Sequence, residues 1–233
     1  MNAGQMKLLV LDVEGTLFET EIRLPGAGFY STIWQAIAKQ LGPEAVREEI
    51  ATHRRWEEGG YKGYVDWMRD TISIHVKHGL SKTIFEKIIT SAKYNGGVLK
   101  TLSRIDRDQY EIVLVSGGFR ELALRVQRDL KILHAFAACE YSFSKNGKLE
   151  NYNLLPCDFA GKLVFVRLML REYKLRPTDW VFVGDGPNDR QIARAAPISI
   201  GYRPHPSLRK IVTCAINDFT ELIPILTRHA KSS

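Results

Sequence analysis

Residues 8–15 read LLVLDVEG, an apolar run that stops at two acidic residues and a glycine. Three similar runs and a weaker fifth follow it along the chain: residues 112–118 (IVLVSGG), 180–186 (WVFVGDG), 198–202 (ISIGY) and 212–218 (VTCAIND). Continuous runs of Val, Ile and Leu are typical of strands buried on both faces of a parallel sheet. The sequence therefore predicts such a sheet, with polar residues at the ends of its strands.

Longer amphipathic segments separate these runs and suit helices that cross from one strand to the next. They span residues 97–105, 119–130, 159–173, 188–195 and 218–228. An alternating segment at 139–155, centred on Asn146-Gly147, predicts a β-hairpin. The order of elements predicts the α/β class, with a Rossmann-like parallel sheet core and helices on both of its faces.

The stretch between the first two strands is rich in Trp, Tyr, Ile and charged residues at helical spacing. We expect a helical cap domain at residues 21–94, inserted after the first strand, and a core made of residues 1–20 and 95–233. Ligands of α/β sheets bind at the carboxyl ends of the strands. An insertion at that place is expected to form a lid over the site.

The composition is that of a folded, soluble protein: 45% of the 233 residues are hydrophobic, 25% are charged, and the formal charge is +7. The basic charge favours an anionic partner. The first residues do not resemble a signal peptide, and no apolar run approaches the roughly 18 residues of a membrane helix. Three widely spaced cysteines favour reduced thiols. We expect a cytoplasmic protein without a membrane partner and assign no oligomeric state.

Asp12, Ser116 and Asp185 lie near the ends of three predicted strands. In a parallel sheet these ends lie at one edge, so the three side chains are expected to converge. A single Asp or Ser in such a place more often caps the following helix. Three of them at one edge indicate a functional site.

Asp12 and Glu14 occupy positions i and i+2 of an extended segment, so their carboxylates lie on the same side and repel one another. A divalent cation relieves this repulsion. Asp185 and Asp189 supply further carboxylate oxygens, which are the ligands that Mg²⁺ prefers. No cluster of Cys or His lies nearby in the sequence, so the pattern favours Mg²⁺ over zinc or copper.

Other residues at these strand ends are suited to bind a phosphate. Ser116 offers a hydroxyl, and Gly117 and Gly118 offer backbone N–H groups before a predicted helix. Thr16 adds a supporting hydroxyl. Lys162, near the start of the predicted helix 159–173, adds positive charge. A lysine in such a place is more often a solvated surface residue.

A carboxylate nucleophile, Mg²⁺, phosphate-binding amides and a lysine together fit phosphoryl transfer through an aspartyl-phosphate intermediate. Asp12 serves as the nucleophile in this interpretation, because a carboxylate needs no general base at neutral pH. Glu14 protonates the leaving alcohol and later deprotonates the attacking water. The sequence thus predicts a phosphomonoester hydrolase that acts on a small phosphorylated substrate.

These segments resemble the haloacid dehalogenase superfamily of phosphatases. DVEGT is similar to its first motif, SGG to its second, Lys162 to its third and GDGPND to its fourth. The SGGF segment, the NGKL hairpin and the predicted cap are most similar to the phosphoserine phosphatase group. The resemblance therefore implies Mg²⁺ as cofactor and a phosphorylated metabolite as substrate.

The resemblance also implies roles for individual residues. The implied catalytic residues are Asp12, Glu14, Ser116 and Lys162. The implied Mg²⁺ ligands are Asp12, the backbone carbonyl of Glu14, and Asp185. The residues implied in phosphate or substrate binding are Ser116, Gly117, Gly118, Lys162, Asn188 and Glu21. The group carries a glutamate facing the substrate's amino group at the place of Glu21, and Asn188, Asp189 and Thr16 are implied as supporting residues.

Two positions depart from the pattern of the group. Glu14 stands where aspartate is more usual, as it does in enolase-phosphatases and in a phosphoserine:homoserine phosphotransferase. If Tyr64 matches the aromatic residue of the group's cap, the carboxylate-binding arginine falls near Thr71, and Arg69 is the closest cation. Phosphoserine is therefore one candidate among small phosphorylated metabolites.

Two alternatives stay open at this point. A phosphotransferase would pass the phosphoryl group to an alcohol such as homoserine. A nucleic-acid-binding protein on the same fold would use basic stretches such as residues 203–210 or 54–56, although solvated surfaces explain both. Nucleic acid is the less favoured partner, because clustered carboxylates repel phosphates.

His75 and His78 lie three residues apart in the predicted cap, and this pattern favours a surface or core role over metal binding.

Overall fold

The computed structural model describes residues 6–24, 28–30 and 32–231. Its elements in chain order are β1 (Lys7–Leu11), β2 (Ile22–Leu24), β3 (Gly28–Tyr30), α1 (Ile33–Leu41), α2 (Pro43–Glu57), α3 (Tyr64–Lys77), α4 (Lys82–Ser91), α5 (Val98–Leu102), β4 (Tyr110–Phe119), α6 (Arg120–Leu130), β5 (His134–Phe143), β6 (Leu149–Leu154), α7 (Ala160–Glu172), β7 (Trp180–Gly184), η1 (Pro187–Asp189), α8 (Arg190–Ala195), β8 (Ile198–Tyr202), α9 (Pro206–Arg209), β9 (Cys214–Ile216), η2 (Phe219–Glu221) and α10 (Leu222–Lys231).

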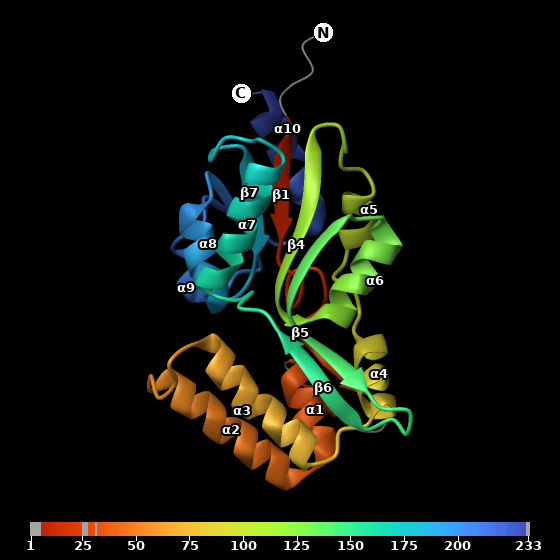
Figure 1. The fold of residues 1–233 in the computed structure, drawn as a ribbon. Helices are drawn as coiled ribbons and strands as arrows, with labels where there is room; N and C mark the ends of the chain where they lie inside the picture. Colours follow the sequence, from red (N-terminus) through yellow and green to blue (C-terminus); the bar gives the residue numbers. More distant parts are fainter. Residues whose placement is uncertain (1–5, 25–27, 31, 232–233) are drawn as a thin grey trace. The chain divides into compact units, whose positions relative to one another are not determined.

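A seven-stranded sheet in the order β6-β5-β4-β1-β7-β8-β9 carries the fold. Strand β1 pairs in parallel with β4 and β7, and β8 pairs in parallel with β7 and β9. Both β1 and β7 are buried along their whole length, which explains their continuous apolar sequences. In Figure 1, α7 and α8 lie on one side of the central strands and α5 and α6 on the other. The predicted α/β class is confirmed.

The ends of several elements differ from the predicted ones. Strand β1 stops at Leu11, so Asp12 and Glu14 lie in the loop that follows it. Strand β4 continues to Phe119, so Ser116, Gly117 and Gly118 belong to the end of the strand and α6 begins after them. Parallel pairing with β1 covers only the first half of β4, from Tyr110 to Leu114. The last predicted helix begins as the 3₁₀ turn η2, which Asp218 caps, and continues as α10.

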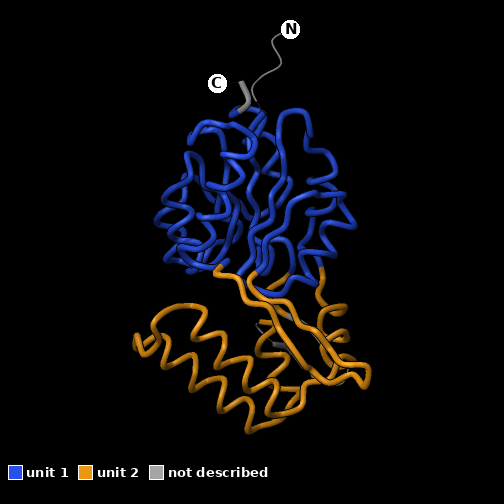
Figure 2. The backbone as a smooth tube through the Cα atoms, viewed as in Figure 1, with its two compact units in different colours: residues 1–18, 94–137, 157–233 blue, residues 19–93, 138–156 orange. Residues whose placement is uncertain are grey.

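The chain divides into two compact units, shown in blue and orange in Figure 2. The first unit comprises residues 1–18, 94–137 and 157–233, and the second comprises residues 19–93 and 138–156. The predicted cap at residues 21–94 corresponds closely to the longer segment of the second unit. Residues 138–156, which include most of β5 and all of β6, also belong to the second unit, whereas the sequence predicts them in the core.

The second unit is mostly helical, as expected, but it also holds a short antiparallel pair of strands, β2 and β3, that the prediction missed. Each strand has only three residues, too few to show a clear alternation. The Pro25-Gly26 dipeptide between them is a turn signal that would have suggested them. The β5-β6 hairpin is confirmed, with Cys139 opposite Leu154 and Tyr141 opposite Tyr152.

His75 is a core residue of the second unit. Its side chain is wholly buried, its Nδ1 lies 2.6 Å from the Tyr141 hydroxyl, and its ring stacks on Trp34. His78 has a different partner, because its Nε2 lies 3.3 Å from Glu48 Oε1. The preference for a structural role over a metal site is in line with these separate contacts. Burial lowers the pKa of His75 to about 3.

The two basic stretches have local partners. Arg54 pairs with Glu58, Arg55 pairs with Asp70, and Trp56 stacks on Trp67. Residues 203–210 include α9, and Arg203 Nε donates a hydrogen bond to the Asn217 carbonyl. Within the described ranges, no helix combines the length and the apolar character needed to cross a bilayer. Cys139, Cys157 and Cys214 are not joined in disulfide bonds.

The neutral state of His75 predicts a pH-dependent stability. The pKa of His75 in the folded protein lies below the ordinary value near 6.5, so the unfolded chain takes up a proton first as the pH falls. The stability that His75 contributes is present above about pH 6.5 and is lost below it, by about 2 kcal/mol between pH 7 and pH 5. Urea unfolding of the wild-type protein and of His75→Gln at both pH values measures this change. Equal losses in the two proteins would contradict it.

Candidate active site

Lys162 lies at the centre of a buried cluster in the first unit. It belongs to the first turn of α7, and its Nζ donates hydrogen bonds to Asp12 Oδ1 at 2.7 Å and Asp189 Oδ1 at 2.6 Å. Its side chain is 0% exposed. Burial alone would lower the pKa of Lys162, but the charges of Asp12, Asp189 and Asp158 raise it well above its ordinary value. The surface interpretation of Lys162 is therefore wrong, because the acidic neighbours stabilise its charge in the interior.

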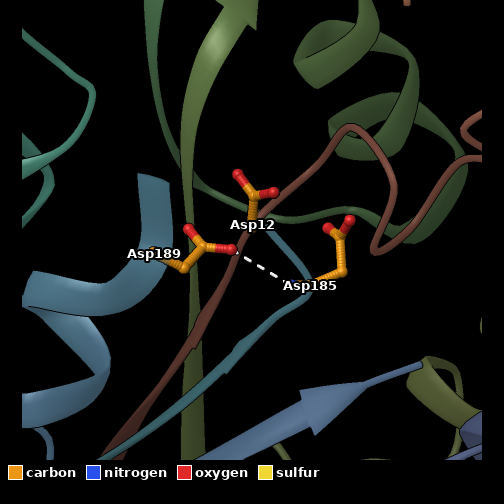
Figure 3. Close-up of side chains that lie close together, drawn as sticks. All are labelled: Asp12, Asp185 and Asp189. Carbon is orange, nitrogen blue, oxygen red and sulfur yellow. Dashed lines mark hydrogen bonds between the residues drawn. The ribbon is translucent and has the colours of Figure 1, made fainter. Parts of the chain in front are cut away.

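Asp12, Asp185 and Asp189 form an acidic cluster beside this lysine. One ligand atom from each residue lies within 4.8 Å of those from the other two, and Figure 3 shows the three carboxylates together. They come from the loop after β1, the end of β7 and the turn η1. The convergence that the strand ends predict is thus present in the structure for these residues.

The oxygens of the three carboxylates are engaged to different degrees. The Oδ1 of Asp189 accepts a hydrogen bond from Lys162, and its Oδ2 accepts hydrogen bonds from the backbone N–H groups of Asp185 and Gly186. One oxygen of Asp12 accepts a hydrogen bond from Lys162, and one oxygen of Asp185 accepts a hydrogen bond from Thr16. Across the described part of the chain, their other oxygens receive no side-chain hydrogen bond. Asp12 and Asp185 can therefore serve as ligands while Asp189 positions Lys162 and the turn.

The excess of negative charge at this cluster suits a divalent cation. Burial raises the pKa of Asp12 well above its ordinary value against the opposing charge of Lys162, and Asp189 and Asp185 raise it further. Burial, with the charge of Asp189, raises the pKa of Asp185 to about 7. A bound cation would favour the ionised form of both carboxylates. Because the donors are oxygens, the residues fit Mg²⁺.

Glu14 is half-buried, and its carboxylate lies next to the end of β4. Burial raises the pKa of Glu14 to about 7, although a backbone hydrogen bond from Phe119 opposes this rise. Its Oε1 is buried and has no hydrogen-bond partner among the described residues. The carboxylate lies against Gly118, where a Cβ would overlap Oε1. A carboxyl group with a pKa near 7 can both donate and accept a proton at neutral pH.

Ser116 is the buried hydroxyl of the site, with 1% of the residue exposed. Its Oγ accepts a hydrogen bond of 3.1 Å from the backbone N–H of Gly118. This contact differs from the expectation that the Gly118 N–H would face an anion. The Ser116 hydroxyl proton remains a possible donor to a ligand, since the oxygen acts here as the acceptor.

Two polar residues that the sequence analysis missed support the site. Asn95 Nδ2 lies 3.0 Å from each of the carbonyl oxygens of Gly15, Thr16 and Phe18, and so fixes the loop that follows Asp12. Asp158 Oδ1 accepts a hydrogen bond of 2.8 Å from Asn188 Nδ2. Asp158 lies four residues before Lys162, and this helical spacing of opposite charges was a usable signal. Asn95 precedes two glycines and is typical of a turn, so nothing in the sequence singled it out.

Other residues named from the resemblance belong to the second unit. The Glu21 side chain is exposed, and its role in substrate binding stays a prediction. Arg69 Nη1 lies 3.4 Å from Asp66 Oδ1. Thr71 is buried in α3, and its hydroxyl donates to the Trp67 carbonyl. Of these last two positions, Arg69 therefore offers the accessible cation.

Comparisons with known proteins point in the same direction. A family model described as a hydrolase, haloacid dehalogenase-like hydrolase, matches residues 6–197. A phosphoserine phosphatase of Lactococcus lactis subsp. lactis is 26% identical over 226 residues, covering 94% of this chain and 93% of that protein. A phosphoserine phosphatase of Archaeoglobus fulgidus is 23% identical over 219 residues, covering 91% of this chain and 57% of that protein.

A solved structure described as a phospho-aspartyl intermediate analogue of phosphoserine phosphatase has the same fold. Its TM-score is 0.74 at 22% identity, and the match covers 95% of this chain and 99% of that chain. A likeness at this level of identity shows the fold and leaves the chemistry to be argued from the residues described above.

The contact between Glu14 and Gly118 predicts the effect of a single methyl group. Gly118→Ala places a Cβ where the Glu14 carboxylate lies and displaces that carboxylate. We expect kcat to fall by about 10²-fold, because misplacing a catalytic group by about 1 Å has an effect of this size. Gly96→Ala is the matched control in the same unit, since a Cβ there meets nothing within 4 Å. Hydrolysis of p-nitrophenyl phosphate measures both variants, and an unchanged kcat in Gly118→Ala would contradict the assignment of Glu14.

The acidic cluster predicts that Mg²⁺ stabilises the folded protein. A ligand at about 100 times its Kd adds about 2.7 kcal/mol, which corresponds to a rise in Tm of roughly 5 °C or more at this size. Thermal unfolding with EDTA and with Mg²⁺ measures the shift without requiring activity. Asp185→Asn should lose most of it, and a shift as large as that of the wild-type protein would exclude Asp185 as a ligand.

Proposed function

This chain belongs to the haloacid dehalogenase-like hydrolase family, and from this membership and its buried site we propose that it is a Mg²⁺-dependent phosphomonoesterase. Its substrate is a small phosphorylated metabolite, and Asp12 carries the phosphoryl group as an aspartyl phosphate. The contact that carries the proposal joins Asp12 to the wholly buried Lys162 at 2.7 Å. One oxygen of Asp12 is thereby fixed and keeps a further lone pair for the metal ion, so the other oxygen is available to attack phosphorus.

The residues around Asp12 bind the phosphate in this proposal. Lys162 donates two of its three N–H groups to Asp12 and Asp189, which leaves the third for a phosphate oxygen. The Ser116 hydroxyl and the Asn188 amide supply neutral donors. Asp12, the carbonyl of Glu14, and Asp185 would hold the metal ion, with Asp189 and Thr16 in support. When bound, Mg²⁺ supplies positive charge that offsets the repulsion between the carboxylates and the phosphate dianion.

The first half of the reaction transfers the phosphoryl group to the protein. The free oxygen of Asp12 attacks phosphorus, and the bond from phosphorus to the ester oxygen breaks as the new bond forms. Glu14 donates its proton to the departing alkoxide, which leaves as an alcohol. The burial that raises the pKa of Glu14 to about 7 keeps a proton available for this step.

The second half releases phosphate. Glu14, now ionised, takes a proton from a water molecule, and the oxygen of that water attacks phosphorus. The bond to Asp12 breaks, which restores the carboxylate, and Glu14 is protonated again. If an alcohol takes the place of this water, the same steps give a phosphotransferase, so the acceptor decides between the two reactions.

The second compact unit is the proposed cap, with the proposed boundaries at residues 21–94 and the core at 1–20 and 95–233. Its place in the chain supports this role, because it follows directly on the loop that carries Asp12 and Glu14. We propose that Glu21 and Arg69 act in the choice of substrate. The relatives named phosphoserine phosphatase support phosphoserine as the first compound to test. A cytoplasmic location, with reduced thiols and no membrane partner, is part of the proposal.

Replacing the nucleophile tests the proposed function. Asp12→Asn keeps the shape of the side chain but removes its nucleophilic charge, so hydrolysis of p-nitrophenyl phosphate with Mg²⁺ should be lost. Glu14→Gln should reduce kcat by roughly 10²–10⁴-fold, the usual contribution of general acid-base catalysis. Asp179→Asn is the matched control, a buried aspartate paired with Arg176. Wild-type rates in Asp12→Asn would refute the proposed nucleophile.

A panel of phosphorylated metabolites, with free phosphate as the readout, identifies the substrate class. A kcat/KM for phosphoserine well above that for phosphates without an amino acid head group would support phosphoserine. Equal values would exclude it. The same reactions with added homoserine, followed for phosphohomoserine, separate the hydrolase from the phosphotransferase.

A further inference from the structure

Asp158 is a buried carboxylate that the reaction described above does not use. It lies just before α7, and its side chain is only 10% exposed. Its Oδ1 accepts hydrogen bonds from Asn188 Nδ2 at 2.8 Å and from the backbone N–H of Phe159 at 2.9 Å. The Lys162 Nζ lies 3.8 Å away, beyond hydrogen-bond distance. Asp158 thus touches one proposed phosphate-binding residue and lies near another.

The third neighbour of Asp158 is Gly117, at the end of β4. A Cβ at Gly117 would overlap the Asp158 carboxylate, so this close approach requires glycine. Asp158 therefore lies where β4, α7 and the turn η1 meet, and all three elements supply proposed phosphate-binding groups. A carboxylate at such a place repels a phosphate dianion. We therefore looked to the contacts of Asp158 for a favourable effect on phosphate binding that offsets this repulsion.

The orientation of Asn188 indicates what that role is. Asp158 holds the amide nitrogen, while the amide oxygen lies close to Gly186, where a Cβ would overlap it. A side-chain amide has two N–H groups. One is bound to Asp158, and among the described residues the other has no acceptor. Without Asp158, the amide could rotate and present its oxygen, which repels the acceptor oxygens of a phosphate.

We infer that Asp158 is a positioning residue for phosphate binding, which acts by holding the Asn188 amide with its nitrogen toward the phosphate. The inference rests on the proposed function, because it takes this site as the phosphate site. Asp158 has a second effect of opposite sign, since its charge weakens the binding of the dianion. The two effects can be separated, because Asp158→Asn keeps an acceptor oxygen and removes the charge.

The experiment compares Asp158→Ala with Asp158→Asn by the Kd of inorganic phosphate, measured by calorimetry with Mg²⁺. Both substitutions remove the charge, so the ratio of the two Kd values isolates the acceptor oxygen. We expect phosphate to bind about threefold to tenfold more weakly to Asp158→Ala than to Asp158→Asn, the effect of one hydrogen bond. The ratio should fall to one when both variants also carry Asn188→Ala, because Asp158 then has no amide to hold.

Matched controls separate positioning from general stability. Asp179→Ala and Asp179→Asn remove a buried carboxylate of the same unit that pairs with Arg176 and lies before β7. The phosphate Kd of Asp179→Ala should equal that of Asp179→Asn, even where the substitutions lower the Tm. If Asp158→Ala does not fold, Asp158→Glu is measured in its place. The glutamate variant keeps the charge but displaces the oxygen that accepts the Asn188 hydrogen bond, so we expect it to bind phosphate more weakly than the wild-type protein.

The outcomes distinguish this inference from the proposed function. Equal Kd values for Asp158→Ala and Asp158→Asn, or a ratio that persists with Asn188→Ala, would overturn the role of Asp158. Should Asp158→Glu be the variant used, a Kd equal to that of the wild-type protein would do the same. Either result is compatible with normal turnover by the wild-type protein. If the wild-type protein binds phosphate but hydrolyses no ester, the proposed function fails while the ratio still reports on Asp158.

Discussion

The ammonium group of Lys162 holds the site together. This buried cation donates hydrogen bonds to both Asp12 and Asp189, which lie in the loop after β1 and in the turn η1 after β7. Without it, the acidic residues would have to be neutral or exposed, because isolated charges are too costly to bury. Even with it, carboxylates remain in excess. This excess suits a divalent cation. It adds to the burial that raises the pKa values of Glu14 and Asp185 to about 7.

The parallel sheet brings the acidic residues of the site together. Strand β1 lies between β4 and β7, so the loops after β1 and β7 and the end of β4 meet at one edge. Glycines at 117 and 118 then let Asp158 and Glu14 approach the backbone of β4 closely. The longer side chain of Glu14 is accommodated by the missing side chain at Gly118. The chain thus combines an unusual glutamate with the space that this glutamate needs.

The strand ends were predictable from sequence because buried parallel strands leave continuous apolar runs, and their ends carry the polar residues. Asp12, Thr16, Asp185 and Asp189 could therefore be identified in advance. The burial of Lys162 could not, since it depends on contacts between residues 27 and 150 positions apart. Asn95 was missed for the same reason, and β2 and β3 were too short to produce a periodic pattern. Sequence patterns report local structure, whereas these features depend on tertiary contacts.

The proposed reaction depends on Asp12 as the nucleophile that forms a bond to phosphorus, and one crystal structure tests this role most directly. Crystals soaked with beryllium fluoride and Mg²⁺ would trap a mimic of an acyl phosphate on the carboxylate that becomes phosphorylated. We expect a tetrahedral beryllium trifluoride group bonded to the Asp12 carboxylate, within reach of Lys162 and Ser116. The same group bonded to Glu14, Asp158 or Asp185 would contradict it.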